Sequence, residues 1–170
     1  MAIPILTYQY FTSGRLAIAG LAGNELGAQA TQTSIQKYIN LFEPKYLKRL
    51  LGDDLYDAFK TGMSVTTPDA RWTNLAAQIY DTTAKESPIA NLVWYKWLSD
   101  HQTVTTASGM KKATASDAAS VNNVQMITDI YNDAVDSLQD VYDWLETNEA
   151  TYPEWEHGAF DFRKINIFDI

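Results

Sequence analysis

Apolar side chains recur every three or four residues through most of the chain, and this period is typical of amphipathic α-helices. Proline, glycine and turn-forming residues divide the pattern, and Pro44 is expected to end one helix or to restart another. The pattern predicts helices over about residues 34–43, 44–51, 53–59, 69–82 and 88–101. The last of these is apolar on more than one side, which predicts a central place in the core.

The longest predicted helix lies in the C-terminal half. Ser116 can cap its first turn, and apolar residues from Val124 to Leu145 keep one face as far as Thr147. About 30 residues at 1.5 Å each give a length of about 45 Å. The preceding segment, residues 102–115, is rich in Thr, Ser and Ala, and it predicts a long loop or weak β-hairpin that projects from the bundle.

Both ends of the chain differ from this helical middle. Residues 1–30 form a predicted N-terminal arm with a glycine-rich segment at 14–27, and residues 148–170 form a C-terminal arm. This arm begins with a turn-rich aromatic segment and ends in residues 160–170, which have high β-propensity. A single apolar strand needs a partner, either the N-terminal arm or a neighbouring subunit. The fold class predicted for the single domain 1–170 is mainly α. We expect a small helical bundle, residues 31–147, with one long C-terminal helix, a projecting loop or hairpin, and extended N- and C-terminal arms.

The charge of the chain is unevenly distributed. The whole chain carries a formal charge of −8, but residues 1–85 sum to +1 and residues 86–170 to −9. Residues 113–160 contain ten carboxylates and no Lys or Arg. Such a balance argues against broad binding to nucleic acid or to anionic membranes, because both require a positive surface. The N-terminus has no basic leader before its apolar residues, so we expect the protein to stay inside the cell that makes it.

Five carboxylates follow one side of the long predicted helix. Their spacing of four, three, four and three residues places them in one row, here called the acidic stripe: Asp129, Asp133, Asp136, Asp140 and Asp143. The row is compatible with a solvated outer face, a charged interface between subunits, or a surface that mimics DNA. A metal site on this helix is disfavoured, because helical di-metal sites also use histidines from Glu-x-x-His pairs on their helices, and the long predicted helix contains no histidine.

The composition removes much of enzyme chemistry. The chain has no cysteine, which excludes thiol nucleophiles and thiolate zinc sites, and its two histidines leave little room for imidazole chemistry. Asp53, Asp54 and Asp57 follow Gly52, where capping of a helix explains them better than acid–base chemistry. His101 lies near a helix C-terminus, where a cation is favoured. We therefore predict no enzyme activity, no cofactor and no metal.

Three segments together resemble a known class of virion proteins. They are YINLFEPKYLKRLLGDDLYDAF at residues 38–59, TTASGMKKA at residues 105–113, and YPEW at residues 152–155 followed by KINIFDI at residues 164–170. The combination resembles the head-tail connector (adaptor) proteins of tailed bacteriophages, as found in phages and prophages of gut bacteria. The glycine-rich segment 14–27 has no counterpart in this resemblance.

The resemblance implies a ring, typically of twelve copies, below the portal protein and around the DNA channel, which joins head to tail. The protein would be made in the host bacterial cytoplasm and located in the virion, without a membrane and without specific DNA binding. The terminal segment would dock onto the portal or a neighbouring subunit through Trp155, Phe160, Phe162, Ile165, Ile167 and Phe168. The loop would contact neighbours or the next tail component through Met110, Lys111 and Lys112.

Two roles are open for the acidic stripe in such a ring. It faces the DNA channel, where carboxylates would keep the sliding phosphates from binding, or it faces the more basic first half of the next subunit. The second role is preferred, with these residues as partners: Lys37, Lys45, Lys48 and Arg49. The alternative function is that of an acidic, DNA-mimicking inhibitor of a host nucleic-acid enzyme.

Overall fold

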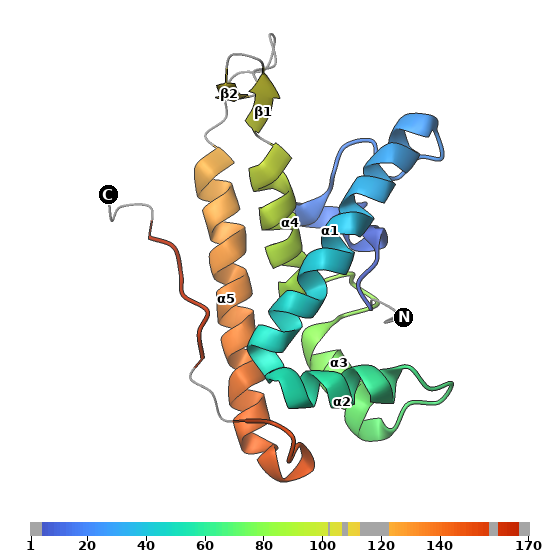
Figure 1. Cartoon of the computed structure of the whole chain (residues 1–170), viewed down its shortest axis with the longest axis vertical. Helices are drawn as coiled ribbons and strands as arrows, with labels where there is room; N and C mark the ends of the chain where they lie inside the picture. Colours follow the sequence, from blue (N-terminus) through green and yellow to red (C-terminus); the bar gives the residue numbers. More distant parts are fainter. Residues whose placement is uncertain (1–4, 102, 107–108, 113–122, 157–159, 167–170) are drawn as a thin grey trace.

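The computed structural model describes residues 5–101, 103–106, 109–112, 123–156 and 160–166. Within them, five α-helices form a bundle, and a small β-hairpin lies at one end of it (Figure 1). The prediction of a mainly α fold with a long C-terminal helix is confirmed. No helix in the described ranges has the length and apolar character needed to span a bilayer.

The first helix, α1 (Leu26–Leu51), runs without a break through Pro44. The predicted division at this proline is therefore wrong, and α1 is the longest helix among the described residues. Apolar residues before and after the proline, such as Ile39 and Leu47, are buried. Burying several such side chains outweighs the roughly 3 kcal/mol that a proline costs in a helix interior.

The helices α2 (Asp53–Met63) and α3 (Ala70–Ile79) form a corner at the lower end of the bundle (Figure 1). Gly52 separates α1 from α2 with a φ of 79°, a conformation that favours glycine and that agrees with its predicted place at a helix end. Asp53 was expected to cap α2 but is its first residue, and its carboxylate accepts a hydrogen bond from Lys48 instead. Asp69 caps α3 by accepting the backbone N–H of Arg71.

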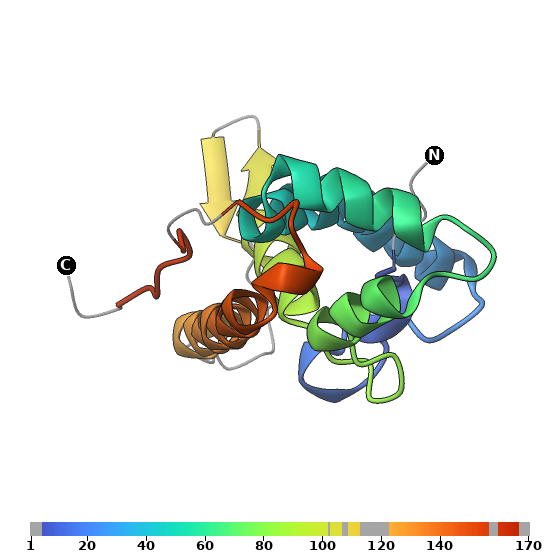
Figure 2. The ribbon, with the colours of Figure 1, turned by 90° about the horizontal axis from the view of Figure 1, so that it is seen from below.

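The centre of the bundle is α4 (Pro88–His101), as its apolar sequence predicts. It packs against both α1 and α5 (Asn123–Thr147), and Figure 2 shows it lying between them. Leu92 and Val93 are fully buried there. The predicted cap of the long helix, Ser116, lies outside the described residues.

The segment after α4 is a hairpin of two short strands, β1 (Thr103–Thr106) and β2 (Gly109–Lys112). The strands are antiparallel, with Thr103 opposite Lys112. The hairpin lies beyond the ends of α4 and α5, at the top of Figure 1. Of the two predicted alternatives, loop or hairpin, the structure has the hairpin.

The N-terminal segment is more compact than the extended arm that the sequence predicts. It forms two 3-10 helices, Tyr8–Phe11 and Gly14–Leu16, and the side chains of Leu6 and Leu21 are fully buried. The glycine-rich part is tied to α1, because Gln32 donates hydrogen bonds from its Nε2 to two backbone carbonyls, at 2.9 and 3.1 Å. This segment is therefore part of the core.

The C-terminal segment forms no strand at residues 160–166, so the predicted pairing with the N-terminal arm is wrong for these residues, while pairing with a neighbouring subunit stays a prediction. It lies beside α5 rather than along the N-terminal segment (Figure 1). The side-chain amide of Asn132 donates to the backbone carbonyl of Ile165 at 3.0 Å and accepts its N–H at 2.8 Å. A helix has no free edge for strand pairing, so this amide satisfies the backbone groups that a strand would have satisfied.

Candidate interaction surfaces

The acidic stripe lies on the exposed side of α5. All five of its carboxylates are exposed, while the opposite side of the helix is buried through Ile130, Ala134, Leu138, Val141 and Leu145. The spacing in the sequence thus predicts the arrangement of these side chains correctly. Their electrostatic environment depends on the rest of the chain.

Two members of the stripe are paired with cations of the same chain. Arg15 of the N-terminal segment forms an ion pair with Asp133, and Lys164 of the C-terminal segment contacts Asp136, with 2.7 Å between Nζ and Oδ1. The stripe is thus partly neutralised near its middle from two sides. Of the remaining three, Asp143 accepts a hydrogen bond from Gln139 at 2.7 Å.

The basic residues of α1 divide in the same way. Lys48 and Arg49 form ion pairs within the chain, with Asp53 and Asp161 respectively. Lys37 and Lys45 are exposed and have no ion-pair partner in the part of the chain that the structure describes. Two of the four predicted partners of the stripe are therefore available to another molecule.

The C-terminal segment is held by contacts with its own chain. Phe162 is buried, and the guanidinium of Arg49 lies over its ring, 4.3 Å from the centroid. Arg49 Nε also donates to the carboxylate of Asp161 at 3.0 Å. Phe162 is therefore not an exposed docking residue, which corrects the prediction for this position.

The other predicted docking residues of this segment differ in exposure. Phe160 is half-buried, and its ring packs edge-on against that of Tyr142, at 5.6 Å between centroids. Ile165 is exposed by 38%, so it remains a candidate for contacts with another chain. Ile167 and Phe168 lie outside the described residues.

Trp155 was predicted to form an interface because its position lies outside the helices, but it is a core residue. Only 5% of its surface is exposed, and its indole packs edge-on against Tyr142 at 5.1 Å. The chain turns back after the 3-10 helix Glu149–Thr151, and this turn brings the indole against α5. The place of Trp155 outside the predicted helices therefore did not make it exposed to solvent.

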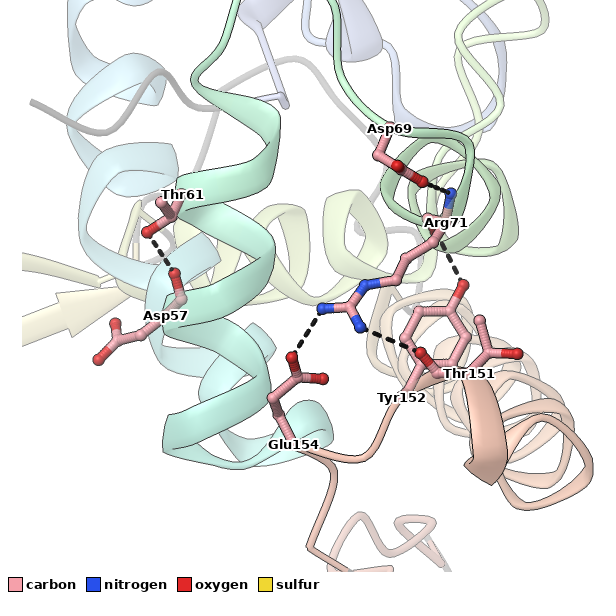
Figure 3. A network of polar contacts seen from close by, with 7 residues as sticks. All are labelled: Asp57, Thr61, Asp69, Arg71, Thr151, Tyr152 and Glu154. Carbon is pink, nitrogen blue, oxygen red and sulfur yellow. Dashed lines mark hydrogen bonds and ion pairs between the residues drawn. The ribbon is translucent and has the colours of Figure 1, made fainter.

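A cluster around Arg71 fixes this turn to α3 (Figure 3). Arg71 donates to the carboxylate of Glu154 at 2.7 Å and to the backbone carbonyl of Thr151 at 3.1 Å, and the hydroxyl of Tyr152 donates to the carbonyl of Arg71 at 2.8 Å. The guanidinium also lies 3.9 Å from the ring centroid of Trp72. Figure 3 shows the guanidinium between the two segments.

The Arg71 cluster also changes an ionisation equilibrium. Partial burial alone would raise the pKa of the Glu154 carboxyl, but the hydrogen bond and the charge of Arg71 outweigh it, so the pKa is lowered. The role of the YPEW segment in this chain is therefore to anchor the end of α5. No sequence motif signals the contacts of Arg71 with this turn, because the residues that they join lie 80 or more positions apart.

Glu43 is a buried acid that is not among the functional residues predicted from the sequence. It is 3% exposed, and its Oε1 accepts the backbone N–H of Leu6 at 3.0 Å and the hydroxyl of Tyr80 at 2.8 Å. Burial raises the pKa of this carboxyl from 4.5 to about 7. A signal was present, since Glu43 lies midway between Ile39 and Leu47 in the apolar row of α1.

The predicted loop residues Met110, Lys111 and Lys112 belong to β2, and their contacts with other subunits or tail proteins stay a prediction.

A pocket of about 430 Å³ lies between the N-terminal segment, the end of α3 and the start of α4. None of the candidates for acid–base chemistry, Asp53, Asp57 and His101, lines this pocket. His101 stacks on Trp97 and hydrogen-bonds to its backbone carbonyl at 2.7 Å. No group of three potential metal ligands occurs within the described ranges.

A comparison with protein families places the chain. It belongs to DUF6712, a family of unknown function whose model matches residues 47–159. The match begins near the end of α1 and includes α2 to α5 and the hairpin, so the N-terminal segment, most of α1 and residues 160–170 lie beyond it. Neither the curated proteins nor the solved structures include a match to this chain.

Proposed function

We propose that this DUF6712 protein is a structural virion protein, a head-tail connector that forms a ring below the portal and around the DNA channel. The observation that carries the proposal is the separation of charge on the surface. Available cations lie on α1 and exposed carboxylates on α5, and α4 lies between these two helices. A molecule with complementary surfaces on different sides favours head-to-tail assembly, which closes into a ring when the rotation between copies permits it.

The connector resemblance adds a direction to this assembly. The hairpin β1–β2 projects at one end of the bundle and the α2–α3 corner lies at the other (Figure 1). A ring of such copies would have two different rims, as a part between head and tail requires. We propose that the hairpin contacts a neighbour or the next tail component. The C-terminal segment, in which Ile165 is an exposed apolar residue, would meet the portal.

The experiment measures mass in solution. Size-exclusion chromatography with light scattering would be run on the protein alone and with the portal protein of the same phage. We expect a ring-sized oligomer, with twelve copies as the first expectation, or a stable complex with the portal ring. A protein that stays monomeric at high concentration and never binds the portal protein would refute the proposal.

The alternative of a DNA-mimicking inhibitor is supported by the exposed row of carboxylates on α5. The ion pairs with Arg15 and Lys164 weaken it, because cations interrupt the row where a DNA backbone would be evenly negative. Competition with duplex DNA for a host nuclease would test this alternative. Charge reversal at Asp129 and Asp140 should then abolish the competition.

A further inference from the structure

An exposed leucine lies between the two available lysines of α1. Leu41 is 65% exposed, and Lys37 and Lys45 lie four residues before and after it. Residues four apart lie on the same side of a helix, so the three side chains form one row with an apolar residue between two cations. At 1.5 Å per residue, the lysines are separated by about 12 Å along the helix.

The exposed side of α5 carries the complementary order. Asp133 and Asp136, in the middle of the acidic stripe, are paired with Arg15 and Lys164. Asp129 and Asp140 flank them, are exposed, and have no ion-pair partner among the residues described. Eleven residues separate these two outer carboxylates, which is about 16 Å along the helix. From Asp129 to Asp140 the charges along α5 are therefore negative, neutralised and negative, with Asp143 one turn further on. The row on α1 is positive, apolar and positive.

The two rows also agree in length. The midpoint between Asp129 and Asp140 lies between Asp133 and Asp136, the two carboxylates that Arg15 and Lys164 neutralise. With Leu41 placed over that midpoint, each lysine would lie about 2 Å short of a carboxylate along the helix direction. A flexible lysine side chain spans such a difference easily.

We propose that the exposed side of α1 in one copy docks on the exposed side of α5 in the next copy. Lys37 and Lys45 pair there with Asp129 and Asp140, and Leu41 packs over the neutralised middle of the stripe. This inference rests on the proposed ring function and identifies the subunit interface of that ring. Because each copy contributes one row of each kind, the contact is head-to-tail and leaves both rows occupied in a closed ring.

Two charge-reversal variants test the interface. One carries Lys37→Glu and Lys45→Glu, and the other carries Asp129→Lys and Asp140→Lys; all four positions are exposed, so circular dichroism should show unchanged helix content. Each variant alone should self-associate at least about tenfold more weakly than the wild type, because two pairs are replaced by repulsion. The effect should shrink at about 1 M salt, where charges are screened within about 3 Å.

Mixing the two variants gives the decisive result. The acidic α1 of the first would meet the basic α5 of the second, and the basic α1 of the second would meet the acidic α5 of the first. An alternating ring then has every interface restored, so the mixture should regain the wild-type mass. The control variants Lys60→Glu and Asp54→Lys, at exposed positions of α2, should assemble normally.

The outcomes separate this inference from the function on which it rests. If the wild type forms rings and the two variants do so equally well, or if both fail and mixing does not restore the mass, the interface lies elsewhere and the ring function stands. If the wild type is monomeric both alone and with the portal protein, the ring function and this interface are both refuted.

Discussion

The buried carboxyl of Glu43 leads to a prediction about how stability depends on pH. In the folded protein its pKa is about 7, whereas the ordinary value is 4.5. Between these values the folded state holds a proton that the unfolded chain releases, so the free energy of unfolding falls as pH rises. The difference between these two pKa values corresponds to about 3 kcal/mol of unfolding free energy, which is present in full below about pH 4.5 and is lost above about pH 7.

The substitution Glu43→Gln isolates this contribution. Glutamine keeps an oxygen that can accept the N–H of Leu6 and the hydroxyl of Tyr80, but it cannot ionise. Urea unfolding of both proteins, followed by circular dichroism at several pH values, gives the difference in unfolding free energy. We expect the wild type to lose about 3 kcal/mol relative to the variant between about pH 4.5 and pH 8.

A matched control uses an acid at the surface. Glu25 is exposed at the start of α1, and Glu25→Gln leaves the buried carboxyl of Glu43 in place, so this variant should still lose stability relative to Glu43→Gln as pH rises. If the difference in unfolding free energy between wild type and Glu43→Gln did not change with pH, the argument would be refuted. A wild type that gained stability relative to this variant as pH rises would show that the sign is wrong. Glu43→Leu should cost about 1–3 kcal/mol for each donor left without an acceptor.

Three further predictions follow from contacts within the chain. Gly62→Ala should lower the free energy of unfolding by about 1–3 kcal/mol in urea titrations, since the added Cβ would overlap the indole of Trp72. The control Gly27→Ala has open space around the added Cβ and should be neutral or mildly stabilising, so equal effects of the two substitutions would contradict the packing argument. Arg71→Lys should lower stability by about 1–2 kcal/mol in thermal unfolding, because a lysine lacks the planar fork that donates to both Glu154 and Thr151. The control Arg163→Lys, at an exposed position, should leave stability unchanged. Deleting residues 161–170 should leave the helices folded in circular dichroism, although about 2 kcal/mol of stability is lost with the buried Phe162. The same deletion should abolish assembly in size-exclusion chromatography, whereas loss of the helical signal would mean that this segment is essential to the fold.

Several features of this protein could be read from local sequence alone. The periodic apolar positions predict the limits of α4, and the spacing of the aspartates predicts the exposed row on α5. The glycine at position 52 predicts the end of α1, where φ is 79°. Each of these depends on residues within a turn or two, because helix geometry determines which neighbours share a face.

The errors have a different cause. Pro44 favours a helix end by local preference, but the buried side chains around it keep α1 continuous. Trp155 and Phe162 are large aromatic residues of the kind found in docking surfaces, yet the chain turns back and buries both against its own helices. In each case local preference was overruled by burial against segments that lie far away in the sequence.

Near neighbours in the sequence therefore predict that these segments are helical and give the order of charges along them, because helix geometry sets which residues share a face. Which charges remain available depends on contacts between distant segments, since Arg15 reaches Asp133 across 118 positions of the chain. Such contacts also bury Glu43 beneath the N-terminal segment, where its charge becomes costly. The path of the chain sets such contacts, and no pattern of near neighbours contains it.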